Sequence, residues 1–129
     1  MEVFSFLFPS PNVLIIVKKI KVKDREELEI EILDAIGKDG PEADLNYIDT
    51  SLITDMSRLF CECIFNGDIS QWDTGNVRNM SRMFADTEFN GDIGGWDTTK
   101  VINMCGMFNG SSFNQDIGRW DVVRVENMC

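Results

Sequence analysis

Residues 65–84 read FNGDISQWDTGNVRNMSRMF, and the same pattern starts again at residues 89 and 113. Residues 65–88 and 89–112 are identical at 13 of 24 positions, and the third copy runs for 17 residues to Cys129. A period in the twenties is typical of solenoids, in which each unit buries its apolar face only against its neighbours. We call residues that recur at this spacing a column. The columns with an expected structural role are Phe65, Phe89, Phe113; Ile69, Ile93, Ile117; Trp72, Trp96, Trp120; Asp73, Asp97, Asp121; Val77, Val101, Val125; and Met80, Met104, Met128.

Each unit divides into two parts. The segment GDISQWD has apolar residues at Ile69 and Trp72 and predicts a short strand. The segment TGNVRNMSRMF has apolar residues at i, i+3, i+6 and i+7 from Val77, which predicts a short helical or 3-10 turn. We therefore expect an α/β fold, a leucine-rich-repeat-like solenoid of 24-residue coils whose short parallel strands stack about 4.8 Å apart.

Moving the frame back by one period reveals a degenerate first coil in residues 41–64, where Leu45 takes the place of Ile69 and Ile48 that of Trp72. The predicted repeat domain therefore spans residues 41–129, with coils at 41–64, 65–88 and 89–112 and an incomplete coil at 113–129. Terminal repeats are expected to be atypical because they cap the stack. Residues 1–40 are expected to form an N-terminal apolar segment and a strand-helix cap.

The N-terminal cap has two predicted elements. Residues 13–22, VLIIVKKIKV, read as a strand, and residues 24–36, DREELEIEILDAI, as an amphipathic helix. Asp24 can cap this helix, Glu27 occupies the capping-box position, and Gly37, Gly40 and Pro41 are expected to end it. Its predicted apolar face consists of Leu28, Ile32, Ala35 and Ile36, with Leu33 beside them.

The apolar start of the chain does not read as an export signal or as a membrane span. Glu2 lies where a signal peptide carries positive charge, and Pro9 and Pro11 interrupt the run. A transmembrane helix needs about 20 apolar residues. We therefore expect no membrane insertion.

Charge and composition exclude several classes of function. The net charge of −10 disfavours nucleic acid, whose binding depends on Lys and Arg neutralising phosphates. The chain has no histidine, so Ser-His and Cys-His catalytic pairs and His-bearing zinc sites cannot be built. We expect no enzyme, no catalytic residues and no metal site.

Two acidic columns favour turn and cap roles, with a calcium site as the less favoured alternative. They are Asp44, Asp68, Asp92, Asp116 and Asp49, Asp73, Asp97, Asp121. The nonapeptide calcium-repeat pattern is absent from the sequence. The asparagine columns 66, 90, 114 and 79, 103, 127 are expected to form side-chain ladders that satisfy loop backbone.

The sequence allows two interpretations of Cys105 and Cys129, which are two of its four cysteines. Cys105 and Cys129 are one period apart, which places them on adjacent coils at a distance that allows a disulfide. The favoured interpretation is two small apolar residues, because no export signal indicates an oxidising compartment. Cys61 and Cys63 form only a weak metal or redox motif.

The pattern FNxDIxxWDxxxVxNMxxMF resembles the methionine-rich branch of the BspA-like leucine-rich-repeat surface-protein family. The copies here are FNGDISQWDTGNVRNMSRMF, FNGDIGGWDTTKVINMCGMF and FNQDIGRWDVVRVENMC, and the resemblance covers residues 41–129. It implies a secreted or surface-exposed, adhesin-like scaffold that binds proteins and has no catalytic residues.

The leading hypothesis is a non-enzymatic protein-protein interaction module with an unidentified protein ligand. Positions that differ between copies are candidates for recognition, because a fixed frame can carry different side chains there. They are Ser70, Gln71, Gly94, Gly95, Arg119 and, in a second set, Asn76, Lys100 and Arg124.

The alternative hypothesis is a truncated fragment of a longer array with no independent function. The final coil lacks seven residues of the period, which leaves apolar columns open at Cys129. Such an end predicts self-association by end-to-end stacking.

Overall fold

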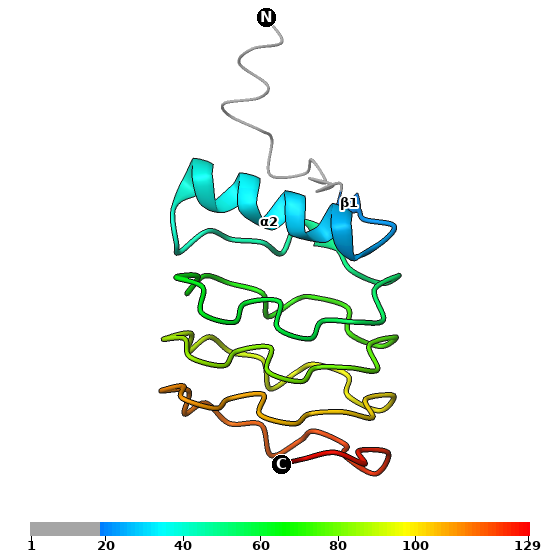
Figure 1. Cartoon of the computed structure of the whole chain (residues 1–129). Helices are drawn as coiled ribbons and strands as arrows, with labels where there is room; N and C mark the ends of the chain where they lie inside the picture. Colours follow the sequence, from blue (N-terminus) through cyan, green and yellow to red (C-terminus); the bar gives the residue numbers. More distant parts are fainter. Residues whose placement is uncertain (1–18) are drawn as a thin grey trace, which may run out of the picture.

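The computed structural model describes residues 19–129, and Figure 1 shows a helix lying across one end of a stack of irregular coils. The apolar segment before Lys19, with most of the strand predicted over residues 13–22, lies outside the described residues. The part of that strand that is described forms β1, Ile20–Lys21. It pairs in parallel with β2, Ile48–Asp49, with Ile20 opposite Ile48. β1 thus adds a strand to the first coil.

The helix, α2, spans Arg25–Asp39. Asp24 is its N-cap, and the Asp24 carboxylate accepts the Glu27 N–H at 3.0 Å. Glu27 in turn accepts the N–H of Lys23 at 2.8 Å. The helix continues past the expected residue 36 and through Gly37, and it ends at Gly40, one of the three residues expected to end it. The backbone of Gly40 has φ 85°, a left-handed conformation that favours glycine, and its N–H donates to the Ile36 carbonyl.

One face of α2 covers the first coil (Figure 1). Leu28, Ile32 and Ala35 are buried there. The expectation that Leu33 lies beside this face is wrong, since 70% of Leu33 is exposed. One residue along a helix turns about 100° from its neighbour, so Leu33 points away from the coil that Ile32 contacts. α2 is too short and too charged to cross a bilayer, and residues 19–129 contain no other helix.

Residues 41–129 form coils that stack one below another (Figure 1). Parallel bridges join residues 24 apart in the sequence: Asp44 with Asp68, Asp55 with Asn79, Asn79 with Asn103, and Asn103 with Asn127. Backbone N–H groups donate to the following coil 23 residues later, one short of the period, as Met80 does to the Asn103 carbonyl at 2.8 Å. The repeat period is therefore the spacing between hydrogen-bonded neighbours in space.

Among the described coils, the first contains the short strand β2, and the others have single bridges and hydrogen-bonded turns in place of regular strands and helices. The segment predicted as a strand bends at Asp68 and again at Asp73, so no extended run is long enough to form one. In the segment predicted as helical, the N–H groups of Arg82 and Phe84 donate to Cys105 and Met107 of the next coil. Those two donors are unavailable to carbonyls of their own coil, which prevents a helix from propagating. The N–H groups of Met83 and Ala85 donate to carbonyls three residues earlier, so the segment forms single turns of the 3-10 type.

The core consists of stacked side chains from successive coils. Trp72, Trp96 and Trp120 stack with ring centroids 6.5 and 6.4 Å apart. Two phenylalanine columns stack in the same way, with centroids 5.7 to 6.2 Å apart: Phe60, Phe84, Phe108 and Phe65, Phe89, Phe113. The other apolar columns are buried in the first three coils and less so in the last, where Ile117 and Val125 are partly buried and Met128 is 60% exposed.

Candidate functional site

The two acidic columns fix two corners of every coil. In each column the carboxylate Oδ1 accepts the N–H of the residue two positions later, at 2.8 to 3.0 Å. The first corner follows Asp44, Asp68, Asp92 and Asp116, and the second follows Asp49, Asp73, Asp97 and Asp121. These carboxylates therefore act as turn residues. Among the described residues, no three acidic or cysteine side chains converge as metal ligands would.

Hydrogen bonding lowers the pKa of several of these carboxyl groups. For Asp68 the main cause is the Asn46 side chain, followed by the N–H of Ser70. For Asp97 it is the Thr99 hydroxyl, followed by the Thr99 N–H. The pKa of Asp49 is lowered mainly by the Ser51 N–H. Each bond favours the charged carboxylate over the neutral acid.

The predicted recognition residues lie at these two corners. Ser70, Gln71, Gly94, Gly95 and Arg119 follow the first acidic column by two or three positions, and Asn76, Lys100 and Arg124 follow the second by three. All are exposed except Ser70 and Gly94, which are partly buried. The structure thus places the candidates in two corner columns, one after each acidic column.

Contacts between coils restrict some of these positions. The Lys100 ammonium donates to the Asn76 side-chain oxygen at 3.0 Å, and the Asn76 amide donates to the Ser51 carbonyl at 2.7 Å. A Cβ on Gly94 would lie 2.6 Å from the Asp116 carbonyl oxygen, so backbone packing explains this glycine. Gln71, Arg119 and Arg124 are the exposed corner residues for whose side chains the structure gives no hydrogen bond.

Polar side-chain atoms in the interior of the stack form hydrogen bonds with backbone carbonyls of neighbouring coils. The indole N–H groups of Trp72, Trp96 and Trp120 donate to backbone carbonyls 27 residues earlier, at 2.9 to 3.0 Å. A column of buried threonines, Thr50, Thr74 and Thr98, was not identified from the sequence. Their hydroxyls donate hydrogen bonds to backbone carbonyls of the next coil, at 2.8 to 2.9 Å. The sequence feature that could have revealed this column is its 24-residue spacing, directly after the second acidic column.

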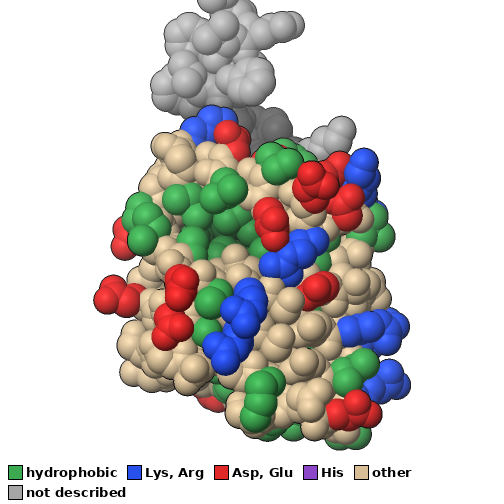
Figure 2. All heavy atoms as spheres, in the orientation of Figure 1, with side chains coloured by type: hydrophobic (Ala, Val, Ile, Leu, Met, Phe, Trp, Pro, Cys, Tyr) green, Lys and Arg blue, Asp and Glu red, His purple; other side chains and the backbone are tan. Residues whose placement is uncertain are grey.

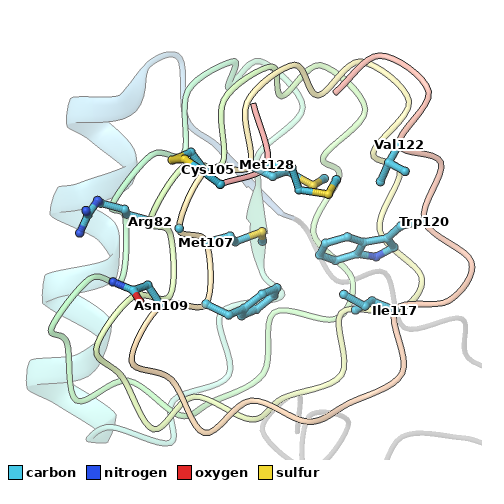
Figure 3. A pocket seen from close by; sticks show the side chains of 12 residues that line it. Arg82, Cys105, Met107, Asn109, Ile117, Trp120, Val122 and Met128 are labelled. Atoms are coloured by element: carbon cyan, nitrogen blue, oxygen red, sulfur yellow. A yellow bond between two sulfur atoms is a disulfide. The ribbon is translucent and has the colours of Figure 1, made fainter. Parts of the chain in front are cut away.

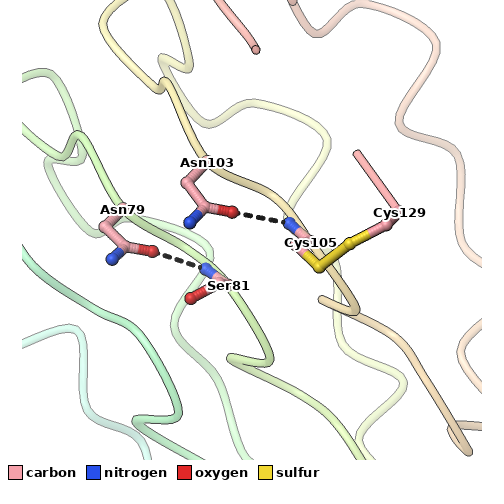
Figure 4. The surroundings of a disulfide bond; sticks show 5 residues. All are labelled: Asn79, Ser81, Asn103, Cys105 and Cys129. Carbon is pink, nitrogen blue, oxygen red and sulfur yellow. Dashed lines mark hydrogen bonds between the residues drawn. A yellow bond between two sulfur atoms is a disulfide. The ribbon is translucent and has the colours of Figure 1, made fainter. Parts of the chain in front are cut away.

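The two asparagine columns behave differently. Asn66 accepts the Asn90 N–H and Asn90 accepts the Asn114 N–H, both at 3.0 Å, which is the expected ladder between coils. The expectation for the second column is wrong in part, because its side chains bond within their own coil. Asn79 accepts the Ser81 N–H and Asn103 accepts the Cys105 N–H (Figure 4). The second column thus continues the turn chemistry of Asp55.

Two further columns have left-handed backbone, and the sequence reading missed both. The first consists of Arg58, Arg82 and Gly106, with φ 57°, 53° and 62°. The second consists of Glu62, Asp86 and Gly110, with φ 59°, 55° and 70°. Gly106 and Gly110 were the available signal, because glycine adopts this conformation without steric cost.

The last coil presents a concavity of about 720 Å³. In Figure 3, Met107, Trp120 and Met128 point into it, while Arg82 and Asn109 lie at its rim. Most of its lining is apolar, because it includes residues of the columns that form the core between the other coils.

A disulfide joins Cys105 to Cys129 beside this concavity (Figures 3 and 4). The favoured prediction of two unpaired thiols is therefore wrong. Adjacent coils bring their Cα atoms to 4.6 Å, within the range that a disulfide requires. Cys61 and Cys63 are free and partly buried.

The match to a family model covers all the coils. A model described as Mycoplasma protein of unknown function, DUF285, matches residues 35–129, well over half of the chain. The chain belongs to this family. The DUF285 region thus starts inside α2 and includes both corner columns, both left-handed columns and the disulfide. Neither the search of curated proteins nor that of solved structures gives a match.

Proposed function

We propose that this DUF285 protein is a leucine-rich-repeat-like solenoid that acts as a non-enzymatic protein-protein interaction module of the BspA-like surface-protein type. The motif FNxDIxxWDxxxVxNMxxMF and its 24-residue period support the BspA-like assignment. The Cys105–Cys129 disulfide supports a surface location, since disulfides persist in oxidising compartments.

The observation that carries the proposal is the contrast between the coil corners and the coil interior. Interior columns repeat the same residue types, and their polar atoms are bonded within the stack. The third residue after each acidic column, by contrast, changes from copy to copy: Gln71, Gly95 and Arg119 at one corner and Asn76, Lys100 and Arg124 at the other. Because carboxylate-bonded turns hold the backbone, these positions can vary without disturbing the core.

A binding screen with corner variants tests the proposal. The purified chain is screened against extracellular proteins, and each captured ligand is titrated against the triple variant Gln71→Ala, Arg119→Ala, Arg124→Ala. We expect the affinity for the ligand to fall at least about tenfold, as for loss of a single strong contact. The double variant Lys19→Ala, Lys38→Ala removes the same number of positive charges at exposed sites away from the corners and should bind normally. Unchanged binding by the triple variant for every ligand contradicts the corner assignment.

A second candidate function is self-association through the last coil. The observation that favours it is the apolar concavity, which is lined by Trp120, Met128 and Val122. Sedimentation equilibrium of wild type should show association that Met128→Asp abolishes. Leu33→Asp, which puts the same charge at a similarly exposed site on α2, is the matched control. A wild-type chain that stays monomeric at high concentration removes this candidate.

A further inference from the structure

The left-handed columns carry charged side chains where glycine would fit better. Arg58 and Arg82 have φ 57° and 53°, a conformation that is unfavourable for residues with a Cβ. Gly106 occupies the same place in the next coil with φ 62°, so the turn itself does not require arginine. Arg58 and Arg82 thus keep an unfavourable backbone conformation although the fold does not require arginine at these positions. Such strain is a reason to look for a function there.

Neither Arg58 nor Arg82 forms an ion pair within the described residues 19–129. Both side chains are exposed, and the ion pairs within residues 19–129 involve Lys23 and Arg25 instead. Figure 2 shows basic side chains in the middle of one face of the stack, with acidic side chains beside them. Arg58 and Arg82 are therefore available to a partner.

The two arginines start from neighbouring coils. The Arg58 N–H donates to the Ser81 carbonyl, and the Arg82 N–H donates to the Cys105 carbonyl, both at 2.9 Å. A Cβ on Gly106 would lie 3.3 Å from Arg82 Cγ and 3.8 Å from its Nε. The Arg82 stem thus lies over the glycine of the third coil, which leaves room for it.

We propose that Arg58 and Arg82 form a binding site for an acidic segment of a partner protein. Guanidinium groups bind carboxylates with paired, charge-assisted hydrogen bonds. The chain as a whole is strongly acidic, with a net charge of −10, so an anionic segment is repelled from most of the surface and attracted where unpaired arginines lie on adjacent coils. This inference rests on the proposed interaction role but uses a different surface from the corner columns.

The double variant Arg58→Gly, Arg82→Gly tests the site without weakening the fold. Each change removes the guanidinium and also relieves the left-handed backbone, so the melting temperature should rise or stay the same. Binding is measured by fluorescence anisotropy with a short labelled peptide of alternating glutamate and threonine. We expect wild type to bind it in a salt-sensitive way, and the double variant to bind at least about tenfold more weakly.

The matched control is Glu62→Gly, Asp86→Gly, which relieves the same conformation in the other left-handed column but removes negative charge. It should bind the peptide as well as wild type or better. Equal binding by the arginine variant, equal wild-type affinity for an alternating lysine and threonine peptide, or capture of a sulfated polysaccharide in place of the peptide each overturns the proposal.

The corner variant separates this inference from the proposed function. If the arginine site exists, Gln71→Ala, Arg119→Ala, Arg124→Ala still binds the acidic peptide. If wild type ignores the peptide but loses a captured ligand through the corner variant, the arginine site is wrong and the corner assignment stands.

Discussion

The indole N–H of Trp96 donates to the backbone carbonyl of Ile69 at 3.0 Å, across 27 residues of sequence. Trp96 also stacks between Trp72 and Trp120, so the same side chain packs against its equivalents in two coils and hydrogen-bonds to a third element of the frame, the corner turn after Asp68. The column therefore joins coils through both apolar and polar contacts.

Trp96→Phe should lower the free energy of unfolding by about 0.5–1.5 kcal/mol, because it removes the indole hydrogen bond to the Ile69 carbonyl, which keeps only the Trp72 N–H as a donor. Urea denaturation followed by circular dichroism measures the change. Trp120→Phe is the internal comparison, since Trp120 is only partly buried and its loss should cost less. Equal losses at the two sites would show that burial does not set the value of this bond.

Gly106→Ala should destabilise the protein by about 1–2 kcal/mol, the cost of a Cβ in left-handed backbone. Gly95→Ala is the control, because a Cβ there meets no atom within 4 Å and no left-handed conformation is involved. It should be neutral or slightly stabilising. Thermal melts that rank the two variants the other way would contradict the assignment of the left-handed column.

Cys129→Ser should lower the free energy of unfolding by about 3 kcal/mol, as expected for a disulfide that closes a loop of this length. Dithiothreitol should lower the melting temperature of wild type but not that of the variant. The double variant Cys61→Ser, Cys63→Ser keeps the disulfide and should respond to the reductant as wild type does. A wild-type melting temperature that ignores the reductant would show that the bond adds no stability.

Acid should destabilise the fold through the corner carboxylates. The folded pKa of Asp68 lies below its ordinary value of 3.8, so the stabilisation is fully present above that value and is lost as pH falls through the folded pKa. Asp68→Asn should flatten the decline in stability below about pH 4, measured by urea denaturation at a series of pH values. Leu33→Asn, at an exposed uncharged residue of α2, is the control and should leave the pH dependence unchanged.

The sequence predicted neighbours better than it predicted conformation. The 24-residue period is also the spacing of the parallel bridges and of the aromatic stacks, because each coil bonds to the next in register. The helical spacing from Val77 corresponds to single turns and not to a regular helix, since inward-pointing residues of an irregular coil can show the same spacing as one face of a helix. The N–H groups that decide between the two bond to another coil, and no local pattern records that choice.

For a related reason, the sequence revealed some residues of the candidate site and not others. Variation between copies indicated exposed positions such as Gln71 and Arg119, because tolerance to change is visible in the sequence. Arg58 and Arg82 were missed because arginine gives no hint of left-handed backbone, and only Gly106 one period later does so. The disulfide was judged from compartment, whereas the distance between adjacent coils was the better guide.

The contacts that hold each coil connect it mainly to the coils directly above and below it, so the structure behaves as a row of linked units and not as one cooperative block. α2 shields the first coil, while the last coil is tied to its neighbour by a covalent bond as well as by packing. Amide hydrogen exchange should therefore slow progressively from residue 129 towards α2 in reduced protein, and oxidation should protect the final two coils most. The protein would then unfold one coil at a time, starting from the coil that the Cys105–Cys129 disulfide joins to its neighbour.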